Sequence, residues 1–273
     1  MISVESTLIA DGFKPRKKLG QHFLIDRNIM GKLVEAADLK STDIVLEIGS
    51  GTGSLTSIIQ EQSGRVVAIE KDPALTGILR RKFAESKKVQ VIEGDVLKTE
   101  LPSFNKVVSS PPYNISSKLI FLLLKKKFDT LVLILQKEFA ERLTAQTGSR
   151  DYGRLTVMVS HRADTRLIEI VPKHAFYPRP KVDSAMVKLT PKEPRTLVFD
   201  EQLFSDLVRE LFTQRNRGLR KVILRLLQRY GDKSNVLLLG LSIPEKRVYQ
   251  TTVEEFETLA NELYQALAKA GSI

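Results

Sequence analysis

Short apolar segments alternate with stretches of helical periodicity through the first two-thirds of the chain, and this alternation constrains the fold more than any other feature. The apolar segments are rich in β-branched residues or leucine and are bounded by turn residues, which is typical of buried strands. They are Ile44–Ile48, Val66–Ile69, Val89–Ile92, Val107–Ser109 and Leu131–Leu135. Between them the spacing predicts helices over 54–62, 73–84 and 115–126, the second starting with Asp72 as N-cap and Pro73 at its first position. Such alternation predicts a mostly parallel sheet covered on both faces.

The remaining third of the chain changes character. The pattern continues less regularly over 153–190, with strands expected at Arg166–Val171 and Val182–Leu189 around the proline-rich segment Pro172–Pro180. Pro191–Arg195 interrupts it and indicates a linker. From about residue 200 onward the apolar residues have helical spacing only. The sequence therefore predicts an α/β domain over 1–195 and a small all-helical domain over 196–273.

Positive charge is in excess and clustered. The formal net charge is +11 and the pI is near 9.7. One cluster lies in the N-terminal segment 1–20 and comprises Lys14, Arg16, Lys17 and Lys18. A second lies in 211–230, which has no acidic residue, and comprises Arg215, Arg217, Arg220, Lys221, Arg225 and Arg229. Clustered cations predict a polyanionic partner, nucleic acid first, although a solvated lysine-rich surface or a disordered basic tail would have the same composition.

Several classes of protein are disfavoured by what the chain lacks. Without cysteine it can form neither disulfides nor a zinc–thiolate site. The N-terminal residues do not have the pattern of a signal peptide, and no apolar run approaches the roughly 20 residues that span a bilayer. His161 and His174 have no partner histidine at ligand spacing, so we expect no metal. We expect a cytoplasmic protein that does not bind membranes and acts as a monomer.

A glycine-rich turn and a set of carboxylates mark the ends of the predicted strands. Gly49, Gly51 and Gly53 follow the first strand, whose Glu47 is an acid in an apolar segment. Glu70 ends the second strand, and Asp95 follows the third. Carboxylates at successive strand ends can accept hydrogen bonds from a ribose and from an adenine amine, which predicts an adenosine-shaped site. Because the third glycine comes one position too early for a dinucleotide-binding motif, S-adenosylmethionine is favoured over NAD.

The fourth strand leads into Ser110–Tyr113, a serine followed by two prolines and a tyrosine. The prolines fix carbonyl directions and remove two backbone donors, beside an aromatic ring. Such an arrangement suits a planar base with an exocyclic amine, whose lone pair becomes reactive when acceptors draw its nitrogen toward tetrahedral geometry. A rigid turn that merely ends a strand is the alternative.

These motifs resemble those of the KsgA family of ribosomal RNA adenine dimethyltransferases, in an archaeal-like form, over nearly the whole chain. The segments that carry the resemblance occur in the family's order: Leu19–Leu24, Glu47–Thr56, Glu70 with Gly94–Leu97, Ser110–Tyr113, Phe176–Ser184, and the basic run that begins at Gln214–Arg215. The resemblance implies a Rossmann-like class I methyltransferase domain, with a predominantly parallel sheet, followed by a helical RNA-binding domain. It also implies the dimethylation of adenines in the RNA of a small-subunit precursor during ribosome biogenesis.

The resemblance also implies roles for individual residues. It implies that the cofactor is held by Gln21, His22, Leu24, Glu47, Gly49, Gly51, Glu70, Lys71, Asp95, Val96 and Ser110. It implies catalytic roles for Ser110, Pro111, Pro112, Tyr113 and Phe176, with Ser110 and the Pro111 carbonyl gripping the amine and the two aromatic rings sandwiching a flipped base. RNA contacts are expected from Lys14, Arg16, Lys17, Lys18, Arg215, Arg217, Arg220 and Lys221.

One departure from the family pattern keeps alternatives open. The family usually has Asn-Leu-Pro-Tyr where this chain has Ser110–Tyr113, and serine is found at this place in methyltransferases of cytosine amines. The alternatives are therefore a methyltransferase of another RNA, such as large-subunit RNA or a cytosine amine, and an RNA-binding assembly factor whose catalysis is secondary.

Overall fold

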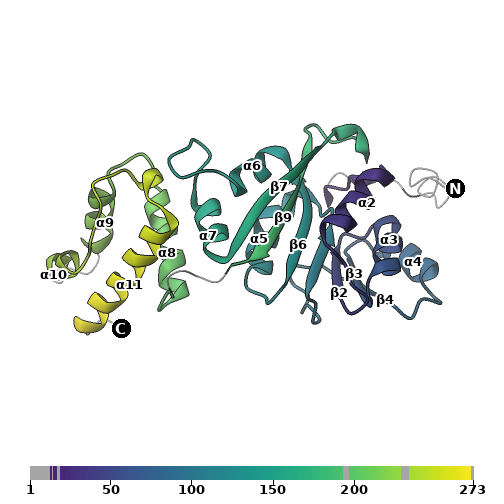
Figure 1. Cartoon of the computed structure of the whole chain (residues 1–273), viewed down its shortest axis with the longest axis horizontal. Helices are drawn as coiled ribbons and strands as arrows, with labels where there is room; N and C mark the ends of the chain where they lie inside the picture. The colour runs from purple at the N-terminus through teal and green to yellow at the C-terminus, as the bar shows by residue number, and fades with distance from the viewer. Residues whose placement is uncertain (1–12, 14, 17–18, 193–196, 229–233, 272–273) are drawn as a thin grey trace. The chain divides into compact units, whose positions relative to one another are not determined.

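The chain folds into two compact units. The computed structural model describes residues 13, 15–16, 19–192, 197–228 and 234–271. An α/β unit comprises Met1–Glu141 and Ala163–Pro191, and a helical unit comprises Arg142–Arg162 and Lys192–Ile273. Figure 1 shows the sheet of the first and the helices of the second.

The α/β unit is built on a seven-stranded sheet in the order β4-β3-β2-β5-β6-β9-β7. Its strands are β2 (Ile44–Ile48), β3 (Arg65–Glu70), β4 (Val89–Glu93), β5 (Lys106–Ser109), β6 (Thr130–Gln136), β7 (Ala163–Val171) and β9 (Ser184–Pro191). Strands β2 to β6 pair in parallel, whereas β9 runs antiparallel to both β6 and β7. This confirms the expected α/β fold with a predominantly parallel sheet.

Helices precede, connect and follow the parallel strands in the chain, and their apolar faces are buried against the sheet. They are α2 (Arg27–Ala36), α3 (Ser54–Gln62), α4 (Pro73–Lys82), α5 (Ser116–Leu123) and α6 (Lys137–Leu143). The Asp72 side chain accepts from the amide of Ala74 and caps α4, as the sequence predicts. Leu33 of α2 and Ile59 of α3 are fully buried in one cluster with strand residues such as Val132. Full burial of such a side chain contributes about 1.5–3 kcal/mol to folding.

A second, two-stranded sheet joins the N-terminal segment to the proline-rich connection. It consists of β1 (Phe23–Leu24) and β8 (Phe176–Tyr177), with Phe23 opposite Tyr177 and Leu24 opposite Phe176. Short 3-10 turns, Tyr113–Ile115 and Lys173–Ala175, precede α5 and β8. Two segments that the sequence analysis treated separately therefore lie side by side.

The helical unit contains α7 (Arg154–Arg162), α8 (Glu201–Phe212), α9 (Leu219–Leu227), α10 (Ser234–Leu239), the 3-10 turn Val248–Gln250 and α11 (Val253–Lys269). Its core contains most of the apolar positions with helical spacing in the sequence, such as Phe204, Leu211, Leu219, Phe256 and Leu263. The hydrophobic pattern therefore locates this core correctly.

The division between the units differs from the expected one. Residues 142–162 were expected to continue the α/β domain, but they belong to the helical unit. The reason is packing, because Tyr152 and Val157 are buried in one cluster with Phe204 and Phe256. The chain therefore leaves the α/β unit near the end of α6 and returns with β7. The expected boundary at 195–196 lies in 193–196, outside the described residues.

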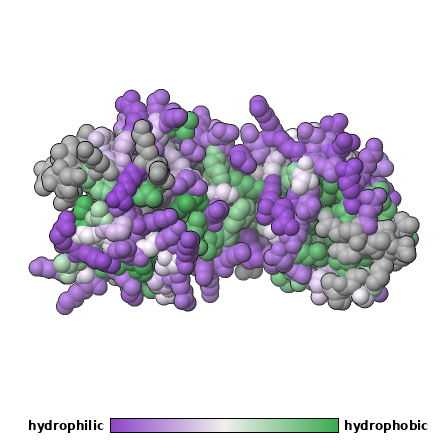
Figure 2. All heavy atoms as spheres, turned by 180° about the vertical axis from the view of Figure 1, so that it is seen from behind, coloured by the Kyte–Doolittle hydropathy of each residue, from purple (hydrophilic) through white to green (hydrophobic). Residues whose placement is uncertain are grey.

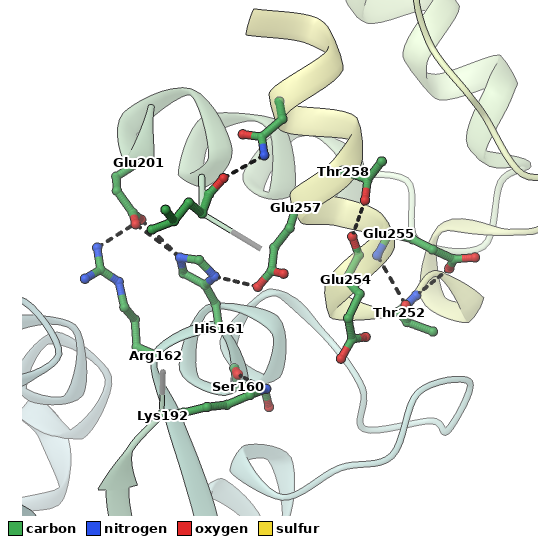
Figure 3. A network of polar contacts seen from close by, with 12 residues as sticks. Ser160, His161, Arg162, Lys192, Glu201, Thr252, Glu254, Glu255, Glu257 and Thr258 are labelled. Carbon is green, nitrogen blue, oxygen red and sulfur yellow. Dashed lines mark hydrogen bonds and ion pairs between the residues drawn. The ribbon is translucent and has the colours of Figure 1, made fainter. Parts of the chain in front are cut away.

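A buried histidine connects three helices of the helical unit (Figure 3). Nδ1 of His161, in α7, lies 2.7 Å from the carboxylate of Glu257 in α11, and its Nε2 lies 3.2 Å from the carboxylate of Glu201 in α8. Glu201 also pairs with Arg162 at 3.0 Å. His161 is 2% exposed, and its ring packs 4.5 Å from that of Phe204. It is a structural residue of this core.

Candidate functional site

A cavity of about 120 Å³ opens at the carboxyl ends of the parallel strands. Its lining residues come from these strand ends and from the N-terminal segment: Leu19, Gly20, Gln21, His22, Phe23, Ile48, Gly49, Ile69, Glu70, Lys71, Leu75, Gly94, Asp95, Val96, Ser110, Pro112, Asn114 and Ile115. A second cavity of about 50 Å³ shares His22, Phe23, Gly49 and Ser110 with it, and Leu24, Glu47 and Gly51 also line it. Every residue that the sequence analysis assigned to the cofactor therefore lines one or both cavities.

The glycine-rich turn adopts a conformation that only glycine takes easily. Gly49, Gly51 and Gly53 all have positive φ, and a Cβ on Gly51 would lie 2.9 Å from the ring of Phe23. The amides of these glycines are already hydrogen bonded within the fold. Gly49 donates to Ile69 O, Gly51 to the Glu70 carboxylate, and Gly53 to Ser50 O, at 2.8, 2.9 and 2.9 Å. None of these three amides is free to bind a pyrophosphate.

Glu70 is held rigidly at the end of β3. Its Oε2 accepts from the amide of Gly51, and its Oε1 accepts from the amides of Lys71 and Asp72 at 2.8 and 2.9 Å. Burial is the largest influence on this carboxyl and raises its pKa, although the three amides oppose that effect. Glu70 thus orients the turn as well as facing the larger cavity.

Asp95, after β4, is more accessible and is paired. Its Oδ1 accepts from the amide of Leu97 at 3.0 Å, and its Oδ2 lies 3.0 Å from Nζ of Lys71. The hydrogen bond from Lys71 is the main cause that lowers the pKa of Asp95, so this group is a carboxylate at neutral pH. Lys71 is therefore a direct neighbour of the Asp95 carboxylate at the cavity.

Glu47 differs from the other acids of the site. It is 2% exposed and accepts a 2.5 Å hydrogen bond from the hydroxyl of Thr56. Burial raises the pKa of Glu47 to about 8. Nearby, Nζ of Lys82 donates to Thr52 O and Gly53 O at 3.2 and 2.8 Å and anchors the glycine-rich turn to α4.

The N-terminal segment covers the cavities through two side chains. The Gln21 side chain donates to the Asp72 carboxylate at 3.0 Å and accepts from the amide of Arg16. Nδ1 of His22 lies 2.6 Å from the carbonyl oxygen of Pro178. The rings of His22 and Tyr113 are nearly parallel, at 22°, with centroids 5.8 Å apart. This segment thus reaches both the end of β3 and the turn after β5.

The turn after β5 lies at the junction of the cavities, but its residues are not equivalent. Ser110 lines both cavities and Pro112 lines the larger, whereas Pro111 is buried and lines neither. Tyr113 is partly buried, and its hydroxyl lies 2.6 Å from Oγ of Ser184 at the start of β9. The strand before the turn is secured by Ser109, whose hydroxyl donates to Ile48 O at 2.7 Å.

Phe176 does not form the expected sandwich with Tyr113. Its side chain is 3% exposed in the α/β core, and its ring meets that of Tyr113 edge-on at 74° with centroids 6.4 Å apart. To hold a base between them, the two rings would have to be exposed and nearly parallel. The sequence motif placed Phe176 near Tyr113 correctly, but the pairing of β8 with β1 turns it into the core.

The residues predicted to bind RNA fall into different environments. Lys14, Lys17 and Lys18 lie outside the described residues. Arg16 lies 3.6 Å from the carboxylate of Asp72, and Arg215 donates to backbone carbonyls, so both serve the fold. The remaining predicted contacts, Arg217, Arg220 and Lys221, are exposed at the start of α9.

Sequence reasoning missed several residues that line the cavities. Asn114 and Ile115 directly follow the Ser110–Tyr113 turn, and Ser50 and Thr52 alternate with the glycines of the first turn. Their positions beside motifs were a usable signal. Met30 and Leu75 come from helices whose burial depends on the tertiary fold, so no local signal could have identified them.

The described residues offer neither a metal site nor a membrane-spanning helix. Within 19–192, 197–228, 234–271 and the few described residues before them, no three His, Asp or Glu side chains are grouped so that they could hold a metal ion. In the same part of the chain, no helix is both long and apolar enough to cross a bilayer.

Comparison with known proteins identifies a family that the chain matches. The family model described as ribosomal RNA adenine dimethylase matches residues 12–265. A protein of Methanosarcina mazei named probable ribosomal RNA small subunit methyltransferase A is 42% identical over 247 residues, which cover 89% of this chain and 91% of that protein.

Solved structures resemble both the fold and its extent. The crystal structure of a dimethyladenosine transferase from Plasmodium falciparum has a TM-score of 0.77 at 32% identity, covering 91% of this chain and 98% of that one. The structure of the 23S rRNA methyltransferase ErmE has a TM-score of 0.66 at 29% identity, covering 89% and 100%. The similarity therefore includes the helical unit as well as the sheet.

Proposed function

Since the chain belongs to the ribosomal RNA adenine dimethylase family, we propose that it dimethylates the exocyclic amine of adenines in small-subunit ribosomal RNA. The methyl groups come from S-adenosylmethionine. The Methanosarcina mazei relative, whose match covers 89% of this chain, carries the name of a small-subunit enzyme. Of the two solved structures described above, the dimethyladenosine transferase has the higher TM-score.

The observation that best supports this cofactor is the state of the glycine-rich turn. The amides of Gly49, Gly51 and Gly53 are satisfied inside the fold, whereas a dinucleotide's pyrophosphate would need such donors. The acceptors that face the cavity, Glu70 and Asp95, instead suit the hydroxyls and the amine of an adenosine. We assign Glu70 to the ribose and Asp95 to the adenine, with Gln21, His22 and Leu24 covering the methionine end.

The residues after β5 would act on the target base. S-adenosylmethionine supplies a methyl group activated on a sulfonium. The Ser110 hydroxyl accepts a hydrogen bond from the adenine amine, the Pro111 carbonyl is the second acceptor, and together they draw the nitrogen toward tetrahedral geometry. Tyr113 provides the ring on which the flipped base stacks. Phe176 packs against the edge of Tyr113 and acts as a positioning residue.

Mapping the modified nucleotides tests this function directly. Small-subunit and large-subunit RNA that lack the modification would both be treated with the protein and S-adenosylmethionine and then reverse transcribed, because dimethylated adenine blocks base pairing. We expect stops at adenines of small-subunit RNA and dimethyladenosine in the digested product. Stops in large-subunit RNA or methylated cytosine would point to the other methyltransferase readings. Small-subunit assembly supported without any methylation would point to an assembly factor.

A further inference from the structure

Residues 172–183, which connect β7 to β9, are bonded to residues of the candidate site. The carbonyl oxygen of Pro178 lies 2.6 Å from Nδ1 of His22, and β8 within the connection pairs with β1. Oγ of Ser184, which directly follows the connection, lies 2.6 Å from the Tyr113 hydroxyl. The connection can be followed in Figure 1 from the end of β7 to the start of β9. It is therefore fixed against the cover of the cavities and against the turn after β5.

An acidic residue braces the backbone of this connection. Oδ1 of Asp183 accepts a 2.9 Å hydrogen bond from the amide of Lys173, and the carbonyl oxygen of Asp183 accepts a 3.0 Å bond from the amide of Lys137. Asp183 is the only acid in 172–183, and none of the cations that the structure describes forms an ion pair with it. Its carboxylate therefore serves the backbone and does not neutralise the cations of the same segment.

Three exposed cations lie on the connection without an ion-pair partner in the described part of the chain. They are Lys173, Arg179 and Lys181, which we call the rim cations. Hydrophilic side chains cover most of the face drawn in Figure 2, so exposed charge alone does not identify a binding surface. Lysines close to the connection are paired, however. Nζ of Lys32 lies 2.6 Å from the carboxylate of Glu169, which belongs to β7. Nζ of Lys137 lies 3.8 Å from the carboxylate of Glu141. The rim cations are distinguished from them by being available to an anion beside the site.

We propose that the rim cations bind the backbone phosphates on either side of the flipped adenosine and so present its base to Ser110 and Tyr113. This rests on the proposed function, which supplies the RNA. A nucleotide leaves its stack by rotating about its backbone, so the phosphates beside it have to be held while the base is out. Phosphate contacts fix the register and orientation of a nucleic acid, and the planar guanidinium of Arg179 suits two phosphate oxygens at once.

The position of the rim cations favours RNA over an acidic protein surface as their partner. Their segment is bonded to His22 and, through Ser184, to Tyr113, so it borders the place where the target base must lie. They are also separate from both basic clusters of the sequence, because they are spread along a proline-rich segment and do not form a run. The rim cations therefore place a phosphate-binding surface on the α/β unit, next to the chemistry.

The first test measures the binding of protein-free small-subunit RNA by the full chain over a range of salt concentrations. The variant is Lys173→Gln/Arg179→Gln/Lys181→Gln, which keeps the bond to Asp183 because Lys173 uses only its backbone amide there. We expect its slope of log affinity against log salt to flatten by about 2.1–2.7 units, as for three lost phosphate contacts. The matched control is Lys125→Gln/Lys126→Gln/Lys127→Gln, which removes three exposed charges at the amino end of β6 and should leave the slope unchanged.

Single-turnover methylation at saturating RNA separates presentation of the base from attraction of the RNA. We expect the triple rim variant to lose roughly tenfold or more in this rate, because a misplaced base reacts slowly even when the RNA is bound. Its affinity for S-adenosylhomocysteine should stay normal. The variant Lys173→Arg/Lys181→Arg keeps the charges and should keep both the rate and the salt slope of the wild type.

Each result has a defined meaning for the rim cations. An unchanged salt slope in the triple rim variant would overturn the proposal and leave an acidic protein as the partner of this surface. A flattened slope with a wild-type rate at saturating RNA would overturn the presentation of the base. If the wild-type chain neither binds nor methylates small-subunit RNA, the proposed function fails instead, which is a different result because it does not depend on any substitution.

Discussion

The carboxylate of Glu70 accepts a 2.9 Å hydrogen bond from the amide of Gly51, and this contact ties the end of β3 to the glycine-rich turn. Glu70 also accepts from the amides of Lys71 and Asp72. The residue assigned to the cofactor's ribose is thus also the residue that shapes the turn beneath it. Substitution of Glu70 should therefore affect both stability and cofactor affinity, whereas substitution of Asp95 should affect mainly cofactor affinity.

Glu70→Gln should lose both stability and cofactor affinity. The amide nitrogen of glutamine cannot accept from backbone amides, and each buried group left unpaired costs about 1–3 kcal/mol. Asp95→Ala should weaken S-adenosylmethionine binding roughly tenfold or more with a smaller effect on unfolding, because Asp95 is more exposed. Calorimetry and denaturant unfolding of both variants measure this. A wild-type stability in Glu70→Gln, or tight NAD binding without S-adenosylmethionine binding, would contradict our assignment.

Much of this site is predictable because it follows from chain direction. Parallel strands end at one edge of a sheet, so Gly49, Glu70, Asp95 and Ser110 had to converge once the strands were recognised. The strand Ile44–Ile48 and the helix 54–62 agree with the structure to the residue. Their apolar pattern and flanking glycines are local signals.

What the sequence could not reveal depends on contacts between distant residues. Residues 142–162 have an ordinary amphipathic pattern, which says that one face is buried but not in which core. Arg215 has the composition of a phosphate contact, yet its donors meet carbonyls more than sixty positions away. Phe176 has the aromatic character of a base-stacking residue, and only the register of β8 with β1 shows that it is buried.

Glu47→Gln should change how stability depends on pH. The folded chain holds the proton of Glu47 up to about pH 8, whereas an unfolded chain releases it near the ordinary pKa of 4.5. The free energy of unfolding therefore falls as pH rises through this window, by at most about 1.4 kcal/mol per pH unit. Glutamine removes this dependence. Denaturant unfolding at both ends of the window measures it, with Glu61→Gln at an exposed position of α3 as the control. Equal pH dependence in Glu47→Gln and wild type would show that Glu47 is ionised throughout.

Removing His161 should destabilise the helical unit. His161→Ala leaves the buried carboxyl of Glu257 without its hydrogen-bond partner, and a buried polar group left unpaired costs about 1–3 kcal/mol. Glu201→Gln should cost much less, because the Glu201 side chain is 46% exposed. Denaturant unfolding of the two variants against wild type measures the difference, while cofactor affinity should stay unchanged. A similar small loss in both would mean that Glu257 is satisfied by water.

The exposed start of α9 should contribute to RNA affinity through charge. Neutralising Arg217, Arg220 and Lys221 together should flatten the salt dependence of RNA binding by about two to three units. The control removes three exposed lysines, Lys125, Lys126 and Lys127, and should have no such effect. Filter binding over a range of salt concentrations measures the slope. An unchanged slope in the α9 variant would show that these side chains are only solvated.

Substitutions of the residues that would contact the target base should lower turnover to different extents. Ser110→Ala removes one hydrogen bond that strengthens in the transition state, so we expect a loss of turnover on the order of 10–100-fold with cofactor affinity nearly unchanged. Tyr113→Ala removes a stacking face worth about 1–3 kcal/mol. Tyr113→Phe keeps that face and loses only the bond to Ser184, so it should retain most of the activity.

Phe176→Ala provides the contrast, because Phe176 is buried and touches Tyr113 only by its edge. Its loss should lower stability by about 3–5 kcal/mol through the cavity it leaves, and should lower turnover only as far as Tyr113 moves. Single-turnover methylation of ribosomal substrate by the four variants, with products counted by mass and unfolding measured in parallel, separates these effects. Full activity in Ser110→Ala would assign the grip to the backbone, and methylated cytosine as the main product would overturn the adenine assignment. A stable but inactive Phe176→Ala variant would instead indicate that Phe176 contacts the base directly.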